Sequence, residues 1–331
     1  MDSAGRGPGG LVATERLSLD DFRSSDAPMI RCLELARAAC RTDLPLLILG
    51  ESGTGKTLLA QAIHNTSSRA RGPFVSFNAA ALSDTLVDSQ LFGHEKGAFT
   101  GAQRQVRGKF ELADQGTLFL DEIADMSPLA QAKILRAVEY GEFERLGSER
   151  LHRADVRLVS ATHFPIDKIA SSERFRRDLF YRISGLTITL PPLRERPQDL
   201  RALIASSIFR AARQQGRSIT GLSKPAAEAL FSHHWPGNLR ELDRVILAAV
   251  ALSAGSVIDL EAILLADHGD RRPPESTGRP ETPADHEMTL GAVERAHVRR
   301  VLATVGGNKA LAARRLGISR ARLERKLAAS K

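Results

Sequence analysis

LPLLILGESGTGKTLLAQAIH, residues 44 to 64, is an apolar run, then a glycine-rich turn, then a stretch with apolar residues at helical spacing. The turn fits the pattern GxxxxGK followed by Ser or Thr. Such a turn between a buried strand and a helix directs backbone N–H groups and the positive end of the helix at phosphate oxygens. We expect Lys56 to reach the β- and γ-phosphates of ATP. The residues predicted to bind ATP are Gly50, Glu51, Ser52, Gly53, Thr54, Gly55, Lys56 and Thr57.

A second apolar run, GTLFLDE at residues 116 to 122, ends in two acidic residues. In a parallel sheet its carboxyl end lies beside the glycine-rich turn. We expect Asp121 and the Thr57 hydroxyl to hold Mg²⁺, and Glu122 to orient and polarise an attacking water. A strand that ends in Asp-Glu is weak evidence alone, but together with the turn it predicts ATP hydrolysis.

Further apolar runs alternate with helical stretches along the chain. They occupy residues 44–50, 73–79, 116–122, 156–162 and 186–192. This alternation predicts an α/β fold with repeated βαβ units and a parallel sheet covered on both faces. A helical segment follows, which we interpret as a lid subdomain. The next segment is rich in proline and has no apolar periodicity, and we interpret it as a linker. The predicted organisation is a lead at 1–21, an α/β ATPase subdomain at 22–195, a helical lid at 196–265, the linker at 266–288 and a small all-α domain at 289–331.

Composition and charge narrow the function classes. No apolar run approaches the ~20 residues that span a bilayer, and the Gly-rich N-terminus has no signal-peptide core, so we expect a cytoplasmic protein. The two cysteines, Cys32 and Cys40, are expected to be packing residues. The whole chain carries +8 formal charges, and residues 289–331 carry eight Arg and three Lys against two Glu, a net of +9. This basic end predicts contact with nucleic acid.

The basic end also has the sequence pattern of a helix-turn-helix. Residues 290–305 show apolar positions at helical spacing, and GGNKALAARRLGISRARLERKL then gives two short helices capped by Asn308 and Ser319, with a turn at Gly317. The expected core positions are Ala312, Leu316, Ile318, Leu323 and Leu327. The residues predicted to contact double-stranded DNA are Ser319, Arg320, Ala321, Arg322, Arg325 and Lys326, with Arg314 and Arg315. A generic basic three-helix bundle is the alternative.

LFGHEKGAFTGA, from Leu91 to Ala102, resembles the signature loop of the sigma-54-dependent activators, the bacterial enhancer-binding proteins. The resemblance covers residues 22–265, and the basic end resembles the Fis-type domain of the same family. It implies an AAA+ ATPase in a homo-oligomeric ring, expected to be a hexamer, that acts on sigma-54 RNA polymerase from upstream DNA. The loop residues implied to contact sigma-54 are Gly97, Ala98, Phe99, Thr100, Gly101 and Ala102. A flexible Gly-rich surface loop is the alternative, although it does not explain the Phe-Thr pair, which we expect to be exposed.

The resemblance also implies roles for single residues. Asn78 corresponds to an asparagine that contacts the catalytic glutamate, although it could instead be a buried asparagine that caps a strand end. Arg176 and Arg182, in RFRRDLFYRI, correspond to arginines that reach the ATP site of a neighbouring subunit. Arg240, in HHWPGNLREL, corresponds to a sensor of phosphate in the same subunit, and Thr162 to the first sensor.

Two positions depart from the family pattern. Thr57 stands where the family commonly has Glu, although it satisfies the general phosphate-loop pattern. His163 follows Thr162 where the family usually has Asn. An imidazole can donate one hydrogen bond as an amide does, so the consequence of this exchange is left open by the sequence.

Two functions of other classes compete with the activator. The first is an ATPase of DNA remodelling or replication, which the GAFTGA sequence disfavours. The second is a DNA-binding repressor with a vestigial nucleotide fold, which the complete set of ATPase residues disfavours. Because residues 1–21 are too short for a sensory domain, we expect that activity is controlled by a separate regulatory protein, by expression level, or not at all.

Overall fold

A computed structural model describes residues 17–79, 83–166 and 175–267, together with Lys309, Ala312, Ala313 and Leu323. The chain divides into two compact units, residues 1–270 and 271–331. Within the described ranges, no helix has the length and apolar character needed to cross a membrane.

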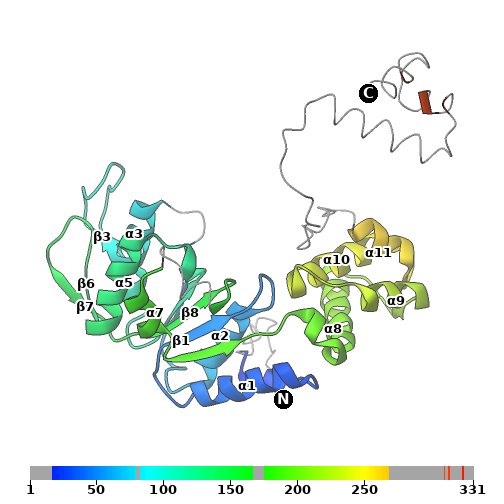
Figure 1. Cartoon of the computed structure of the whole chain (residues 1–331), viewed down its shortest axis with the longest axis horizontal. Coiled ribbons are helices and arrows are strands. Elements are labelled where there is room, and N and C mark those ends of the chain that lie inside the picture. Colours follow the sequence, from blue (N-terminus) through cyan, green and yellow to red (C-terminus); the bar gives the residue numbers. More distant parts are fainter. Residues whose placement is uncertain are drawn as a thin grey trace, which may run out of the picture. The chain divides into compact units, whose positions relative to one another are not determined.

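The first unit is built on a five-stranded, fully parallel sheet (Figure 1). Its strands, in spatial order, are β2 (Phe74–Asn78), β5 (Thr117–Asp121), β8 (Arg157–Thr162), β1 (Leu46–Leu49) and β9 (Leu186–Thr189). Each coincides with one of the apolar runs in the sequence, so the predicted parallel sheet is confirmed. Every residue of β1 and β8 is buried, which explains why these strands read as continuous apolar runs.

Helices cover both faces of this sheet, as the sequence predicts. Because side chains alternate along a strand, Leu46 and Ile48 of β1 pack on one face with α1 (Ala27–Ala39) and α2 (Lys56–Thr66). Leu47 and Leu49 pack on the other face with α3 (Asp84–Phe92), α5 (Pro128–Tyr140) and α7 (Arg177–Ile183). Both cysteines are free thiols buried in the first of these cores, which confirms their packing role.

Short elements connect the main ones. The two β-hairpins are β3 (Gly93–His94) with β4 (Val106–Arg107), and β6 (Glu142–Glu144) with β7 (Leu151–Arg153). The short helices are η1 (Leu19–Asp21), α4 (Lys109–Leu112), η2 (Ile123–Asp125) and η3 (Leu193–Glu195).

Four helices follow the sheet and enclose a separate apolar core around the buried Trp235. They are α8 (Pro197–Gln215), α9 (Lys224–Ser232), α10 (Asn238–Leu252) and α11 (Leu260–Asp267), with β10 (Gly221–Leu222) pairing in parallel to β11 (Val257–Ile258). Local sequence signals define where these helices begin. α8 starts at a proline, and the Ser223 hydroxyl caps α9 by accepting the N–H of Ala226 at 3.3 Å. The predicted helical lid is confirmed.

Of the second unit, the structure describes four residues, all helical. Ala312 and Leu323 are fully buried, as expected of the predicted helix-turn-helix core, and Ala313 is buried beside them. The capping residues Asn308 and Ser319 and all the predicted DNA-contact residues lie outside the described residues. Those contact residues are Ser319, Arg320, Ala321, Arg322, Arg325, Lys326, Arg314 and Arg315.

Candidate nucleotide site

The glycine-rich turn joins the end of β1 to the start of α2. At Gly53 the backbone has φ of +78°, and a Cβ atom there would lie 2.3 Å from the carbonyl oxygen of Gly237. This position therefore requires glycine for two reasons, the left-handed conformation and the close approach of the lid. Gly55, also left-handed, caps the N-terminus of α2, so the first N–H groups of the helix open into the turn.

Lys56 is the first residue of α2, and its side chain is only 6% exposed. Its Nζ donates hydrogen bonds to the carbonyl oxygens of Gly50, at 2.8 Å, and Glu51, at 3.3 Å. The ammonium group is thus held inside the turn, at the N-terminus of the helix. A positive charge in this place suits the β- and γ-phosphates of a nucleotide.

Asp121 ends β5 beside the same turn, and its backbone register pairs it with Asn78 at the end of β2. Its Oδ2 accepts a bond from Asn78 Nδ2 at 3.4 Å, and its Oδ1 accepts the N–H of Glu122 at 3.1 Å. Asn78 is exposed, so its interpretation as a buried strand cap is wrong. The sequence predicted a contact of Asn78 with Glu122. The described hydrogen bond instead joins Asn78 to Asp121, because β2 and β5 are neighbours and end in register.

The electrostatics of Asp121 fit a bound cation. Burial first, and then the adjacent Glu122 charge, raise the pKa of Asp121 above its ordinary value, while Lys56 and Arg240 oppose this shift. A divalent cation would relieve the repulsion between the two carboxylates. Thr57, exposed in the first turn of α2, adds a hydroxyl of the kind that Mg²⁺ accepts, so the donors present suit that ion.

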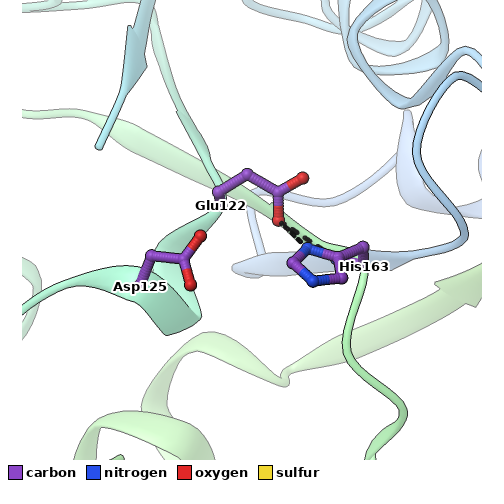
Figure 2. A group of neighbouring side chains, drawn as sticks. All are labelled: Glu122, Asp125 and His163. Atoms are coloured by element: carbon purple, nitrogen blue, oxygen red, sulfur yellow. Dashed lines mark hydrogen bonds and ion pairs between the residues drawn. The ribbon is translucent and has the colours of Figure 1, made fainter. Parts of the chain in front are cut away.

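Glu122 leaves β5 in the left-handed conformation, with φ of 52°. Its Oε1 lies 3.8 Å from Lys56 Nζ, and its Oε2 lies 2.8 Å from His163 Nδ1 (Figure 2). Thr162 is fully buried, and its hydroxyl accepts the N–H of Phe164 at 3.2 Å. At the end of β8 it is therefore His163, and not Thr162, whose side chain contacts Glu122. Asp125 completes a cluster with Glu122 and His163 whose ligand-type atoms lie within 4.8 Å of one another.

The lid meets the turn through the N-terminus of α10. Arg240 Nη1 donates to Ser52 Oγ at 2.9 Å, and the N–H of Leu239 donates to the Gly53 carbonyl oxygen at 3.0 Å. The predicted sensor arginine therefore lies at the turn of its own chain. Thr54, another predicted loop residue, donates its hydroxyl to the Glu51 carbonyl oxygen at 2.8 Å.

Two residues at this junction were missed by the sequence reasoning. Asn238 is fully buried, and its Nδ2 donates to Ser52 O at 3.0 Å and to Glu51 Oε2 at 3.2 Å. Arg194 forms a bidentate pair with Glu51, at 2.6 and 2.8 Å, and lowers the pKa of that carboxyl. The Gly-Asn pair at the start of α10 was a usable signal for Asn238, because asparagine tolerates the left-handed conformation that it adopts, with φ of 51°. No sequence signal distinguishes Arg194 from other surface arginines.

The GAFTGA loop, residues 97–102, lies between β3 and β4. Gly97 N–H bonds to the Ala102 carbonyl oxygen at 2.8 Å, which closes the loop at its base. The sequence predicted that Phe99 is exposed, but it is only partly exposed, because its ring meets that of His94 edge-on with centroids 5.0 Å apart. Ala98 is half-buried and Ala102 is buried, whereas Thr100 and Gly101 are exposed.

Arg176 is the N-cap residue of α7, and Arg182 lies in its last turn. Arg176 forms an exposed ion pair with Asp178 at 2.6 Å, and Arg182 Nη2 donates to the Val138 carbonyl oxygen at 3.2 Å. Among the described residues, the hydrogen bonds of these two arginines go to partners outside the nucleotide site. Both side chains are exposed on the surface of the first unit.

Three successive segments of the chain match known protein families. Residues 22–189 match the Sigma-54 interaction domain, residues 194–277 match the AAA+ ATPase lid domain, and residues 289–329 match the bacterial regulatory proteins of the Fis family.

Similar proteins agree with these matches. The chain is 43% identical to the Transcriptional regulatory protein ZraR of Klebsiella oxytoca, over 91% of this chain and 67% of that protein. It is 43% identical to the Nif-specific regulatory protein of Azotobacter vinelandii, over 88% of this chain and 55% of that protein. Among solved structures, NtrX from Brucella abortus is similar with a TM-score of 0.70 and 31% identity, over 92% of this chain and 68% of that one. NtrX has also been solved in complex with ATP, and that structure is similar with a TM-score of 0.68 and 31% identity, over 93% of this chain and 68% of that one.

The phosphate turn, Asp121 and Glu122 lie in the segment that matches the Sigma-54 interaction domain, which also contains the loop at residues 97–102, whereas Arg240 lies in the segment that matches the lid. The chain belongs to the family of sigma-54-dependent transcriptional regulators, with an AAA+ ATPase domain, its lid and a Fis-type helix-turn-helix domain.

Proposed function

We propose that this protein activates transcription by coupling ATP hydrolysis in a ring-shaped homo-oligomer, expected to be a hexamer, to remodelling of the closed complex of sigma-54 RNA polymerase. The observation that carries the proposal is the combination, in one domain, of a phosphate turn with adjacent acidic residues and a separate GAFTGA loop on its own hairpin. Lys56 and Arg240 bind the ATP phosphates, Thr57 and Asp121 hold Mg²⁺, and Glu122 polarises the attacking water.

Arg176 and Arg182 act on the nucleotide of a neighbouring subunit. Their exposure, and hydrogen bonds that lead away from the site of their own chain, support this assignment. A guanidinium group supplied in trans neutralises the charge that develops on the γ-phosphate, so hydrolysis requires assembly.

Residues 289–331 read an upstream DNA site and localise the ring beside the promoter. The net charge of this segment and the Fis-family match support this role. Residues 266–288 serve as the linker between the lid and the DNA-binding domain. The protein acts in the bacterial cytoplasm, at the nucleoid.

Thr100→Ala tests the function of the GAFTGA loop. Thr100 is exposed on the loop between β3 and β4, which is a different element from the turn and strand ends that carry Lys56, Asp121 and Glu122, so we expect hydrolysis not to require it. We expect the variant to keep ATPase activity within about twofold of the wild type while losing the ability to open a sigma-54 promoter. ATPase rate and open-complex formation are measured on one preparation.

Thr85→Ala is the matched control, because Thr85 is an exposed threonine on α3 that the proposal gives no role. It is expected to preserve both activities. Normal promoter opening by Thr100→Ala would contradict the activator function of the loop, and parallel loss of ATPase activity would place Thr100 in the hydrolytic site instead.

A further inference from the structure

The Glu122 carboxylate is held at two points by one residue. The backbone N–H of His163 donates to Glu122 Oε2 at 3.2 Å, and His163 Nδ1 lies 2.8 Å from the same oxygen (Figure 2). An ionised carboxylate only accepts hydrogen bonds, so Nδ1 carries the proton in this pair. The two donors together occupy the lone pairs of Oε2.

The arrangement follows from the sheet order. β5 and β8 are neighbours, and Glu122 and His163 are the first residues beyond their carboxyl ends. The left-handed backbone at Glu122 is a conformation that few non-glycine residues adopt, and here it accompanies a side chain directed at the end of β8. The imidazole also contacts the ring of the neighbouring Phe164, with ring centroids 4.1 Å apart.

The other carboxylate oxygen of Glu122 faces the phosphate turn. Oε1 lies 3.8 Å from Lys56 Nζ, an ion-pair distance that leaves it without a direct hydrogen bond to that group. Asp125 and Asp121, the other acids nearby, add negative charge to the same region. One oxygen of Glu122 is therefore anchored, and the other is presented to the place where the γ-phosphate and its attacking water would lie.

We propose that His163 is a positioning residue for hydrolysis, which anchors Oε2 of Glu122 so that Oε1 is oriented toward the attacking water. The inference rests on the proposed role of Glu122 as the residue that polarises water. His163 does not contact the nucleotide in this scheme, so it affects the rate of the chemical step and leaves ATP binding unchanged. An amide at this position also donates one hydrogen bond, so asparagine is expected to replace the imidazole in function.

His163→Ala and His163→Asn test the proposal in the full-length protein. The alanine variant keeps the backbone N–H bond and loses the side-chain bond. We expect kcat to fall about tenfold or more, because a hydrogen bond to a charged group is lost and the carboxylate is no longer oriented. The KM for ATP and the affinity for a fluorescent ATP analogue should stay within about twofold of the wild type. The asparagine variant should recover kcat to within about threefold.

The assays are run at protein concentrations where the specific activity of each variant has reached its plateau, so that differences in assembly do not enter. An alanine variant with wild-type kcat, or an asparagine variant no better than alanine, would overturn the inference. A KM that rises while kcat is unchanged would make His163 a nucleotide contact and would also overturn it.

Glu122→Gln separates this inference from the function on which it rests. Loss of turnover in Glu122→Gln with normal kcat in His163→Ala refutes the positioning role alone. Substantial turnover in Glu122→Gln refutes the role of Glu122, and the positioning role with it.

Discussion

Lys56, Asp121 and Glu122 form a set of charges that depend on one another. The Lys56 ammonium group is anchored by two backbone carbonyl oxygens of the turn and lies close to the Glu122 carboxylate. Burial makes the charge of Asp121 costly, and the raised pKa of its carboxyl records this cost. Removing any one of these charges therefore changes the electrostatic balance of the other two.

Arg182→Ala should abolish ATP turnover and spare ATP binding, because its guanidinium group is expected to serve a neighbouring subunit. Lys56→Ala should instead lose binding by about tenfold or more, since it removes the buried charge in the phosphate turn. Titration with a fluorescent ATP analogue and steady-state ATPase assays separate the two effects.

Arg177→Ala provides a matched control for Arg182→Ala, because Arg177 is an exposed arginine on the same helix. It should leave turnover near the wild-type rate. An Arg182→Ala protein that hydrolyses ATP normally would contradict the assignment in trans.

At the scale of elements, the main feature is the junction between the phosphate turn and the start of α10. Ser52 and Gly53 receive hydrogen bonds from Arg240, Leu239 and Asn238. A change of conformation in the turn is thereby linked directly to the lid. This junction gives the lid a physical means of responding to what the turn binds.

Gly53→Ala should disrupt this junction. The added Cβ would lie 2.3 Å from the Gly237 carbonyl oxygen, at a backbone φ of +78° that costs a non-glycine residue about 1 kcal/mol or more. We expect ATP affinity to fall about tenfold or more, as measured by titration with a fluorescent analogue. Because both the turn and α10 must shift, the melting temperature should fall as well.

Gly255→Ala serves as the control for Gly53→Ala. A Cβ at Gly255 would meet no atom within 4 Å, and its backbone lies outside the positive-φ region. This variant should bind ATP like the wild type. Normal ATP affinity in Gly53→Ala would show that the turn and the lid are not coupled through this contact.

At the scale of the whole molecule, the candidate nucleotide site and the segment that matches the Fis family lie in different units of the chain. The described residues of the candidate nucleotide site all lie within residues 17–267. The basic excess lies in residues 289–331. The two activities should therefore be separable by truncation.

Deletion of residues 289–331 should remove site-specific DNA affinity and retain most of the ATPase activity. Binding by the intact protein should weaken steeply with salt, since Lys and Arg contacts release counterions from DNA. Footprinting at several salt concentrations, with ATPase assays on the same samples, measures both properties. A truncated protein that protects the same site would show that another segment reads the DNA.

The sequence by itself determined the sheet, the phosphate turn, the helical lid and the family. These features depend on local order: apolar runs that form buried strands, glycines at fixed spacing, and prolines and serines at helix starts. Lys56 and Asp121 lie beside each other at this turn for the same reason, because Lys56 directly follows the glycine-rich turn and Asp121 ends a strand that the sequence defines.

Only the tertiary structure decided which side chains meet across the site. Asn78 bonds to Asp121, Glu122 to His163, and Phe99 packs against His94. Each of the first two pairs joins residues some forty positions apart, and their contact depends on strand order and register. Periodicity along the chain carries no information about that order, so the anchoring of Glu122 by His163 became visible only when β5 and β8 lay side by side.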